Sequence, residues 1–183
     1  ALNDFDLPFD GGILDRYRQI NSALWLDFEK GEVSASRLKV LRFERLLASF
    51  GMEGQRDPAR FSATYLSHLG DCAELIDGAG HVVRALQVQT RLALITNGLK
   101  EVQRSRLAKS GLEPFFDAVI ISDEIGSAKP DARIFDVAFA RMGEPKRSDV
   151  LIVGDSLTSD MKGGRDYGID TCWFRSEERR VGK

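Results

Sequence analysis

The chain has 183 residues, a length typical of one domain or of one domain with a sizeable insert. Its composition, with 43% hydrophobic and 30% charged residues, is that of an ordinary globular protein and excludes collagen-like, low-complexity and disordered classes. The 26 basic and 28 acidic residues give a formal net charge of −2, so the surface as a whole offers no basic field to a nucleic-acid polymer or an anionic membrane.

The sequence contains no pattern that indicates export or membrane insertion. Its apolar runs are much shorter than the roughly 18 residues of a membrane-spanning helix. The first ten residues, ALNDFDLPFD, combine neither a basic region nor an apolar region of the kind found in signal peptides. Cys72 and Cys172 lie far apart and outside any CxxC pair, which predicts reduced, packed thiols. We therefore expect a cytoplasmic protein.

Residues 1–76 predict an all-helical domain. Ser34 or Ser36 is expected to cap its second helix, and Gly51 to end that helix. The dipeptide Asp57-Pro58 is typical of the start of a third helix. Apolar residues recur at helical spacing in these three segments: Ile13, Tyr17, Ile20, Leu24, Phe28; Leu38, Leu41, Phe43, Leu46, Leu47, Phe50; and Phe61, Tyr65, Leu69, Cys72, Ile76.

Residues 77–174 predict an α/β domain, because short apolar strands alternate with helices. The strands are expected at 91–96, 118–122, 150–153 and 171–174, and the helices at 81–89, 101–109, 131–142 and 157–167. Continuous apolar strands joined by helices indicate a buried parallel sheet. The predicted fold class is thus α/β, with a Rossmann-like parallel sheet core preceded by the helical domain. The last segment, 175–183, is highly charged without periodicity, and we expect a non-native or disordered tail.

Polar residues gather where the predicted strands end, which is where parallel sheets place their chemistry. The first strand ends in Thr96, followed by Asn97 and Gly98. A hydroxyl beside a turn of backbone N–H groups suits a phosphate oxygen, although a helix cap with a glycine turn explains the same residues. After the second strand, Lys129 precedes a proline and offers a cation at a defined place, or it is an exposed loop lysine.

The third strand runs into a loop that carries two carboxylates, Asp155 and Asp160. Carboxylate oxygens are hard ligands that suit Mg²⁺, and Gly154 permits a tight turn at this point. A capping aspartate followed by a surface aspartate is the alternative for this motif taken alone. The order of the three motifs favours a catalytic site, because three independent alternatives would otherwise all have to hold.

This ordered set resembles motifs II, III and IV of the haloacid dehalogenase (HAD) superfamily of phosphohydrolases. The resemblance implies a catalytic set of Thr96, Asn97 and Lys129. In it, the Thr96 hydroxyl hydrogen-bonds the transferring phosphoryl group, and Lys129 neutralises charge on the nucleophile and the phosphate. It further implies that Asp155 and Asp160 hold Mg²⁺ directly or through water.

The chain is more closely similar to the pyrimidine 5′-nucleotidase branch of the superfamily, over nearly its whole length up to Phe174. The similarity includes the stretches QINSALWLDFEKGEVS and SDEIGSAKPDARIFD. It implies a Mg²⁺-dependent phosphomonoesterase whose partner is a small phosphorylated metabolite, a pyrimidine nucleoside monophosphate. Residues 1–76 would then be the cap domain, inserted after the first strand of the core.

One motif of the family is not found in the sequence. Motif I, DxDxT at the end of an apolar strand, supplies the aspartate that attacks phosphorus and a second aspartate that acts as acid and base. The pair Asp4 and Asp6 has neither a preceding apolar strand nor a following Thr. We therefore expect the chain to be a fragment that lacks motif I and is inactive on its own.

The cap is expected to select the substrate. On the first helix, Asn21 and Trp25 lie beside the apolar stripe, where an amide next to an indole could hydrogen-bond to and stack on a pyrimidine. A tryptophan packed at the seam between the cap and the core explains the same pattern. The basic residues of the second helix, which include Arg37, Arg42 and Arg45, could attract phosphate or form a solvated helix face.

Two other functions remain open at this stage. One is a HAD phosphatase for another small phosphate ester, such as a sugar phosphate. The other is a non-catalytic doubly wound binding module, in which Thr96 and Asp155 cap helices; such a module gives no reason for Lys129 to lie between them. The sequence has no P-loop or GxGxxG turn after a strand, which disfavours ATP or NAD binding. The dehalogenase branch needs no Mg²⁺ and is disfavoured by the aspartate pair.

Overall fold

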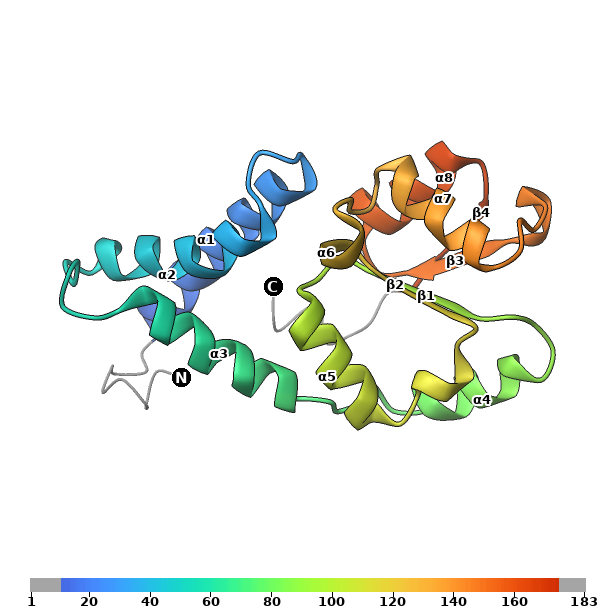
Figure 1. Cartoon of the computed structure of the whole chain (residues 1–183), viewed down its shortest axis with the longest axis horizontal. Coiled ribbons are helices and arrows are strands. Elements are labelled where there is room, and N and C mark those ends of the chain that lie inside the picture. Colours follow the sequence, from blue (N-terminus) through green and yellow to red (C-terminus); the bar gives the residue numbers. More distant parts are fainter. Residues whose placement is uncertain (1–10, 175–183) are drawn as a thin grey trace. The chain divides into compact units, whose positions relative to one another are not determined.

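The computed structural model describes residues 11–174 and divides the chain into two compact units, Ala1–Cys72 and Ala73–Lys183 (Figure 1). The division falls slightly before residue 76, the boundary expected from the sequence. The third helix ends at Asp71, and the backbone of Cys72 is extended, with φ −78° and ψ 95°. The predicted continuation of its apolar stripe through Cys72 to Ile76 is therefore wrong, and Ile76 is 42% exposed.

The elements follow the predicted order. The α-helices are α1 (Gly11–Glu29), α2 (Ala35–Ser49), α3 (Pro58–Asp71), α4 (Ala79–Gln87), α5 (Lys100–Ser110), α6 (Ser122–Ile125), α7 (Ala132–Arg141) and α8 (Lys162–Tyr167). The strands are β1 (Ala93–Thr96), β2 (Ala118–Ile121), β3 (Leu151–Gly154) and β4 (Asp170–Trp173). Two 3₁₀ turns, η2 (Glu113–Phe115) and η3 (Arg147–Asp149), and a π-helical turn, η4 (Leu157–Met161), complete the described chain.

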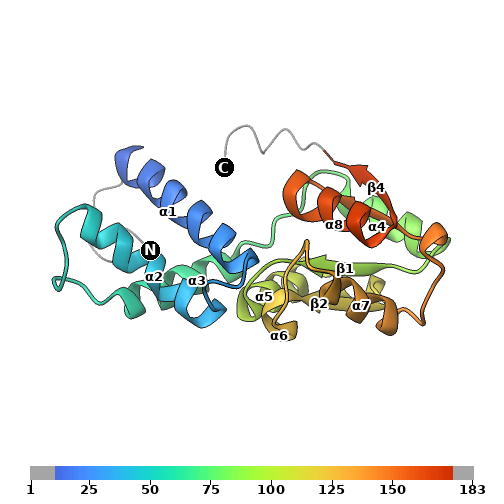
Figure 2. The ribbon, with the colours of Figure 1, turned by 90° about the horizontal axis from the view of Figure 1, so that it is seen from above.

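In the helical unit, α2 packs against both α1 and α3 (Figure 2). The Ser34 hydroxyl caps α2 by accepting from the Arg37 N–H, and the Asp57 carboxylate caps α3 by accepting from the Ala59 N–H. Each cap satisfies an N–H that would otherwise lack a partner in the first helical turn. The core contains these buried residues: Ile20, Leu24, Leu38, Phe43, Leu46, Leu47 and Phe61.

The second unit contains two parallel strand pairs. β1 pairs with β2 in the register Ala93↔Ala118 to Thr96↔Ile121, and β3 pairs with β4. Among residues 11–174 the two pairs are separate two-stranded sheets, where the sequence suggests one continuous sheet. α7 packs against β2 and α8 against β4, while α4 and α5 lie on the other side of the β1–β2 pair (Figure 1). This is a mixed α/β unit with parallel strands.

Its core lies between the strands and the helices α7 and α8. Phe135 is fully buried and stacks on Tyr167, with 5.1 Å between ring centroids. The Tyr167 hydroxyl donates to Asp136 Oδ1 at 2.7 Å, and burial together with this carboxylate raises the pKa of the tyrosine. These side-chain contacts hold α8 against α7.

One face of the β3–β4 pair is exposed, so the prediction of a fully buried sheet is wrong there. Leu151 and Val153 are 57% and 60% exposed, whereas Ile152, between them, faces α8 and packs against the core. Cys172 pairs with Val153 across the strands and is exposed too, as is Cys72. The prediction of packed thiols is thus also wrong. No element within residues 11–174 covers the face that carries Cys172, and Cys72 lies where the extended backbone leaves α3. Within the same range, no helix has the length and apolar character to cross a bilayer.

The two leucines at positions 24 and 26 of α1 test the helical core. Leu24 is completely buried and Leu26 is 50% exposed. We expect Leu24→Ala to lower the free energy of unfolding by about 2–5 kcal/mol, through lost apolar contacts and the cavity left behind. Leu26→Ala should change it by less than about 0.5 kcal/mol. Urea denaturation followed by circular dichroism measures both, and equal effects would contradict the packing described.

Candidate active site

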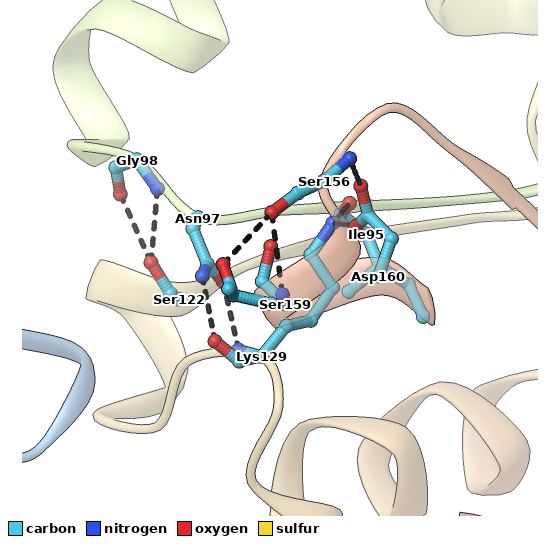
Figure 3. A network of polar contacts seen from close by, with 9 residues as sticks. Ile95, Asn97, Gly98, Ser122, Lys129, Ser156, Ser159 and Asp160 are labelled. Atoms are coloured by element: carbon cyan, nitrogen blue, oxygen red, sulfur yellow. Dashed lines mark hydrogen bonds and ion pairs between the residues drawn. The ribbon is translucent and has the colours of Figure 1, made fainter. Parts of the chain in front are cut away.

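The candidate site is built around the side chain of Lys129, which the structure buries at the carboxyl end of β1 (Figure 3). Its ammonium nitrogen donates to the Ile95 carbonyl oxygen at 2.7 Å and pairs with Asp160 Oδ1 at 2.7 Å. The side chains of Lys129 and Asp160 are only 11% and 7% exposed. Burying a charge is costly unless it is paired and hydrogen-bonded, and both conditions are met here.

The backbone of Lys129 is held as firmly as its ammonium group. The Asn97 amide donates from Nδ2 to the Lys129 carbonyl oxygen, and its Oδ1 accepts from the Lys129 N–H, both at 2.8 Å (Figure 3). Asn97 is predicted from the sequence as part of the catalytic set. The structure directs its amide to the backbone of Lys129, so this residue fixes the place from which the lysine side chain extends.

A serine not singled out in the sequence fixes the turn after β1. Ser122 is fully buried at the end of β2, where its hydroxyl accepts from the Gly98 N–H at 3.0 Å and lies 3.4 Å from the Gly98 carbonyl oxygen (Figure 3). The available signal was its place directly after an apolar strand, the same place that Asn97 occupies after β1.

Thr96 is the last residue of β1 and lies between the two residues that contact Lys129. It is in register with Ile121 of β2. Thr96 is partly exposed, and its hydroxyl hydrogen-bonds to no residue within the described range 11–174. The hydroxyl is thus available to an oxygen atom of a ligand at this edge.

The loop after β3 brings Asp160 to the lysine. Ser156 begins η4, where its hydroxyl accepts from the Ser159 N–H at 3.2 Å. Its backbone N–H donates to Asp160 Oδ2 at 2.9 Å. A Cβ atom at Gly154 would lie 2.4 Å from Asp160 Cγ, so glycine is required there for the carboxylate to reach Lys129. Both Asp160 oxygens therefore have protein partners.

Asp155, the other predicted metal ligand, follows β3 directly and is partly buried. Its carbonyl oxygen accepts from Trp173 Nε1 at 3.2 Å, which ties the loop to β4. Mg²⁺ needs several oxygen ligands, and residues 11–174 contain no group of three Asp, Glu, His or Cys side chains that could hold a metal ion. With Asp160 engaged by Lys129 and Ser156, the residues of the described range do not by themselves provide a Mg²⁺ ligand set.

The two predicted substrate residues lie on α1 in the helical unit. Asn21 Oδ1 accepts from Arg42 Nη1 at 3.4 Å. Trp25 packs against the helical core and meets the Phe28 ring edge-on, with 5.5 Å between centroids. Part of the indole therefore has a packing role. The pair Asp4 and Asp6 and the predicted tail 175–183 lie outside the described residues.

The arrangement at the strand ends is suited to an oxyanion. A rigid cation and an available hydroxyl can stabilise negative charge without reorganising. A comparison with known families matches residues 12–168 to the haloacid dehalogenase-like hydrolases. The chain belongs to this family.

Individual relatives match most of this HAD hydrolase. The pyrimidine 5′-nucleotidase YjjG of Escherichia coli is 32% identical over 176 residues, which cover 96% of this chain and 76% of YjjG. The pyrimidine 5′-nucleotidase PynA of Streptococcus pneumoniae is 35% identical over 161 residues, which cover 87% and 67% of the two chains. The crystal structure of the HAD-hydrolase YfnB from Bacillus subtilis, bound to magnesium, is 35% identical and superposes with a TM-score of 0.91. That superposition covers all of this chain and 81% of YfnB.

The buried ion pair provides a test of the site's architecture. We expect Asp160→Asn to lower the free energy of unfolding by about 3–5 kcal/mol, because it leaves the buried Lys129 ammonium without its charge partner. The control is Asp166→Asn, the same change in an exposed pair with Lys162. It should leave the denaturation midpoint within experimental error, because solvent screens that pair. If Asp160→Asn shifted the denaturation midpoint as little as Asp166→Asn does, the result would contradict a buried, stabilising ion pair.

Proposed function

We propose that the site serves a Mg²⁺-dependent phosphomonoesterase that hydrolyses pyrimidine nucleoside 5′-monophosphates. The observation that carries the proposal is the ammonium group of Lys129, fixed by Ile95 and Asp160 at the edge where β1 ends in Thr96. The similarity to two pyrimidine 5′-nucleotidases, YjjG and PynA, supports the choice of substrate class.

The residues of this edge would act by positioning and charge stabilisation. Phosphoryl transfer spreads negative charge over the equatorial phosphate oxygens, and a fixed cation lowers the energy of that state. In the proposal the Lys129 ammonium faces one such oxygen while the Thr96 hydroxyl donates to another. Asn97 and Ser122 act indirectly, by holding the backbone of Lys129 and Gly98.

The covalent step requires a carboxylate that the described residues do not supply. In the proposed reaction an aspartate of a DxDxT motif attacks phosphorus, the ester P–O bond breaks, and the second aspartate protonates the leaving alcohol. Water then hydrolyses the aspartyl-phosphate and releases inorganic phosphate. Asp155 would contribute one ligand to Mg²⁺, and the complete ligand set includes oxygens from outside residues 11–174.

Substrate selection is proposed for the helical unit. Asn21 is partly exposed, and its Oδ1 is directed toward Arg42, which leaves the two N–H groups of its amide to donate to a carbonyl of a pyrimidine. Trp25 would offer the exposed part of its indole for stacking. A sugar phosphate has no planar base, so the two substrate classes should respond differently to a change at position 21.

Phosphate release tests the proposal directly. We expect the 183-residue chain to hydrolyse UMP and a generic aryl phosphate at background rates, because no DxDxT sequence is present to supply a nucleophile. Adding an N-terminal apolar strand that ends in DxDxT should give turnover that EDTA abolishes. The measurement is inorganic phosphate released from UMP, from an aryl phosphate and from a sugar phosphate, with Mg²⁺ and with EDTA.

Variants of the extended chain separate the roles. Asp155→Asn should remove most of the turnover, since a metal ligand is lost, whereas Asn21→Ala should chiefly alter the ratio of UMP to sugar-phosphate hydrolysis. The effects on turnover of losing the nucleophile and of losing the metal ligand should not be additive, because both groups belong to one catalytic unit. Robust, EDTA-sensitive turnover by the unextended chain would overturn the assignment of the nucleophile and direct attention to Asp4 and Asp6. Hydrolysis of sugar phosphates alone would overturn the nucleotide assignment.

A further inference from the structure

A groove on the helical unit shares no lining residue with the edge that carries Lys129. It runs between α1 and α2 and has a volume of about 520 Å³, within the range of small-molecule sites. None of its lining residues comes from α3 or from the α/β unit. The lining residues are Arg16, Gln19, Ile20 and Ala23 of α1, and Arg45, Ala48 and Ser49 of α2.

The groove carries a local positive charge in a chain whose net charge is negative. Each wall contributes one exposed guanidinium, Arg16 from α1 and Arg45 from α2, and no lining residue is acidic. Among residues 11–174, neither guanidinium forms an ion pair. Arg16 donates one hydrogen bond, of 3.4 Å, to Gln19 Oε1.

The other arginines of α2 are already engaged, which sets Arg45 apart. Arg37 forms two hydrogen bonds of 2.7 Å with the Glu44 carboxylate. Arg42 is buried and stacks over the Phe43 and Tyr65 rings, at 5.2 and 5.0 Å from their centroids. The three arginines of the second helix therefore have different surroundings. Arg37 belongs to a surface ion pair, Arg42 to the core and Arg45 to the groove.

We propose that this groove binds a small organic anion that bears phosphate or carboxylate groups. A guanidinium presents several N–H donors in a plane that matches the oxygens of either group. Gln19 adds amide N–H donors, since its Oε1 already accepts from Arg16. Ile20, which is 7% exposed, together with the small side chains of Ala23 and Ala48, gives the groove an apolar floor for the carbon part of the ligand.

The positive charge that attracts such an anion comes from side chains and not from a helix dipole. Ala48 and Ser49 lie in the last turn of α2, at the helix end whose dipole repels an anion, and the Ser49 hydroxyl donates to the Leu46 carbonyl oxygen. Binding must then depend on Arg16 and Arg45 and must weaken as salt screens them.

The test is a titration of the ¹⁵N-labelled 183-residue chain with inorganic pyrophosphate, followed by NMR, with citrate as a second arm. We expect saturable shifts of the Ala23, Ala48 and Ser49 amide signals, which shrink as NaCl is raised. Arg45→Gln and Arg16→Gln should each raise the Kd about tenfold, the effect of losing one charged hydrogen-bonding partner. The matched control is Arg37→Gln on the same helix, whose guanidinium is paired with Glu44, and it should leave the Kd unchanged.

The outcomes are distinct. Binding of pyrophosphate alone assigns the groove to phosphate-bearing ligands, binding of citrate alone assigns it to carboxylates, and binding of both shows that charge decides. The proposal is overturned if neither anion shifts the groove signals, if the shifts are confined to the edge that carries Lys129, or if Arg37→Gln weakens binding as much as Arg45→Gln. Because the readout is binding at named amides of α1 and α2, it is independent of whether the chain is a nucleotidase.

Discussion

A single buried ammonium group organises the candidate site at the edge of the α/β unit. Removing the charge of Lys129 from water is tolerated because a carboxylate and a backbone carbonyl replace the lost hydration. Those two partners come from different parts of the chain: Ile95 belongs to β1 and Asp160 to the segment after β3. One side chain thereby fixes the ends of two strands that share no backbone hydrogen bond within residues 11–174.

The residues around Lys129 follow from this requirement. The amide of Asn97 sets the lysine backbone, so that the long side chain begins at a defined point and loses less entropy on being held. On the other side, Gly154 leaves the space that Asp160 occupies. The Lys129 ammonium, the Asn97 amide and the absence of a side chain at Gly154 thus act together. The result is a preorganised cation, the property that stabilisation of a phosphoryl group demands.

The sequence predicts the elements well because their signals are local. Ser34 and the Asp57-Pro58 pair mark helix starts that the structure contains. Contacts that depend on tertiary structure were not predictable in the same way. The sequence around Asn97 does not indicate whether its amide binds a ligand or the backbone of a residue 32 positions away. Likewise, an aspartate in a loop has the same sequence signal whether it binds a metal ion or, as Asp160 does, a lysine. The exposure of Cys172 depends on which face of β4 is covered, and strand periodicity does not encode that.

The exposed side of β3 has a consequence for how the chain behaves in solution. Within residues 11–174, β3 pairs with β4 along one edge only, and Leu151 and Val153 present their side chains to water on one face. An unpaired strand edge beside exposed apolar side chains is a template for pairing with another polypeptide. Through this edge and face, the described part of the chain is expected to self-associate more as the protein is concentrated. A lysine at position 151 would favour the dispersed monomer, since charged side chains on edge strands oppose edge-to-edge association.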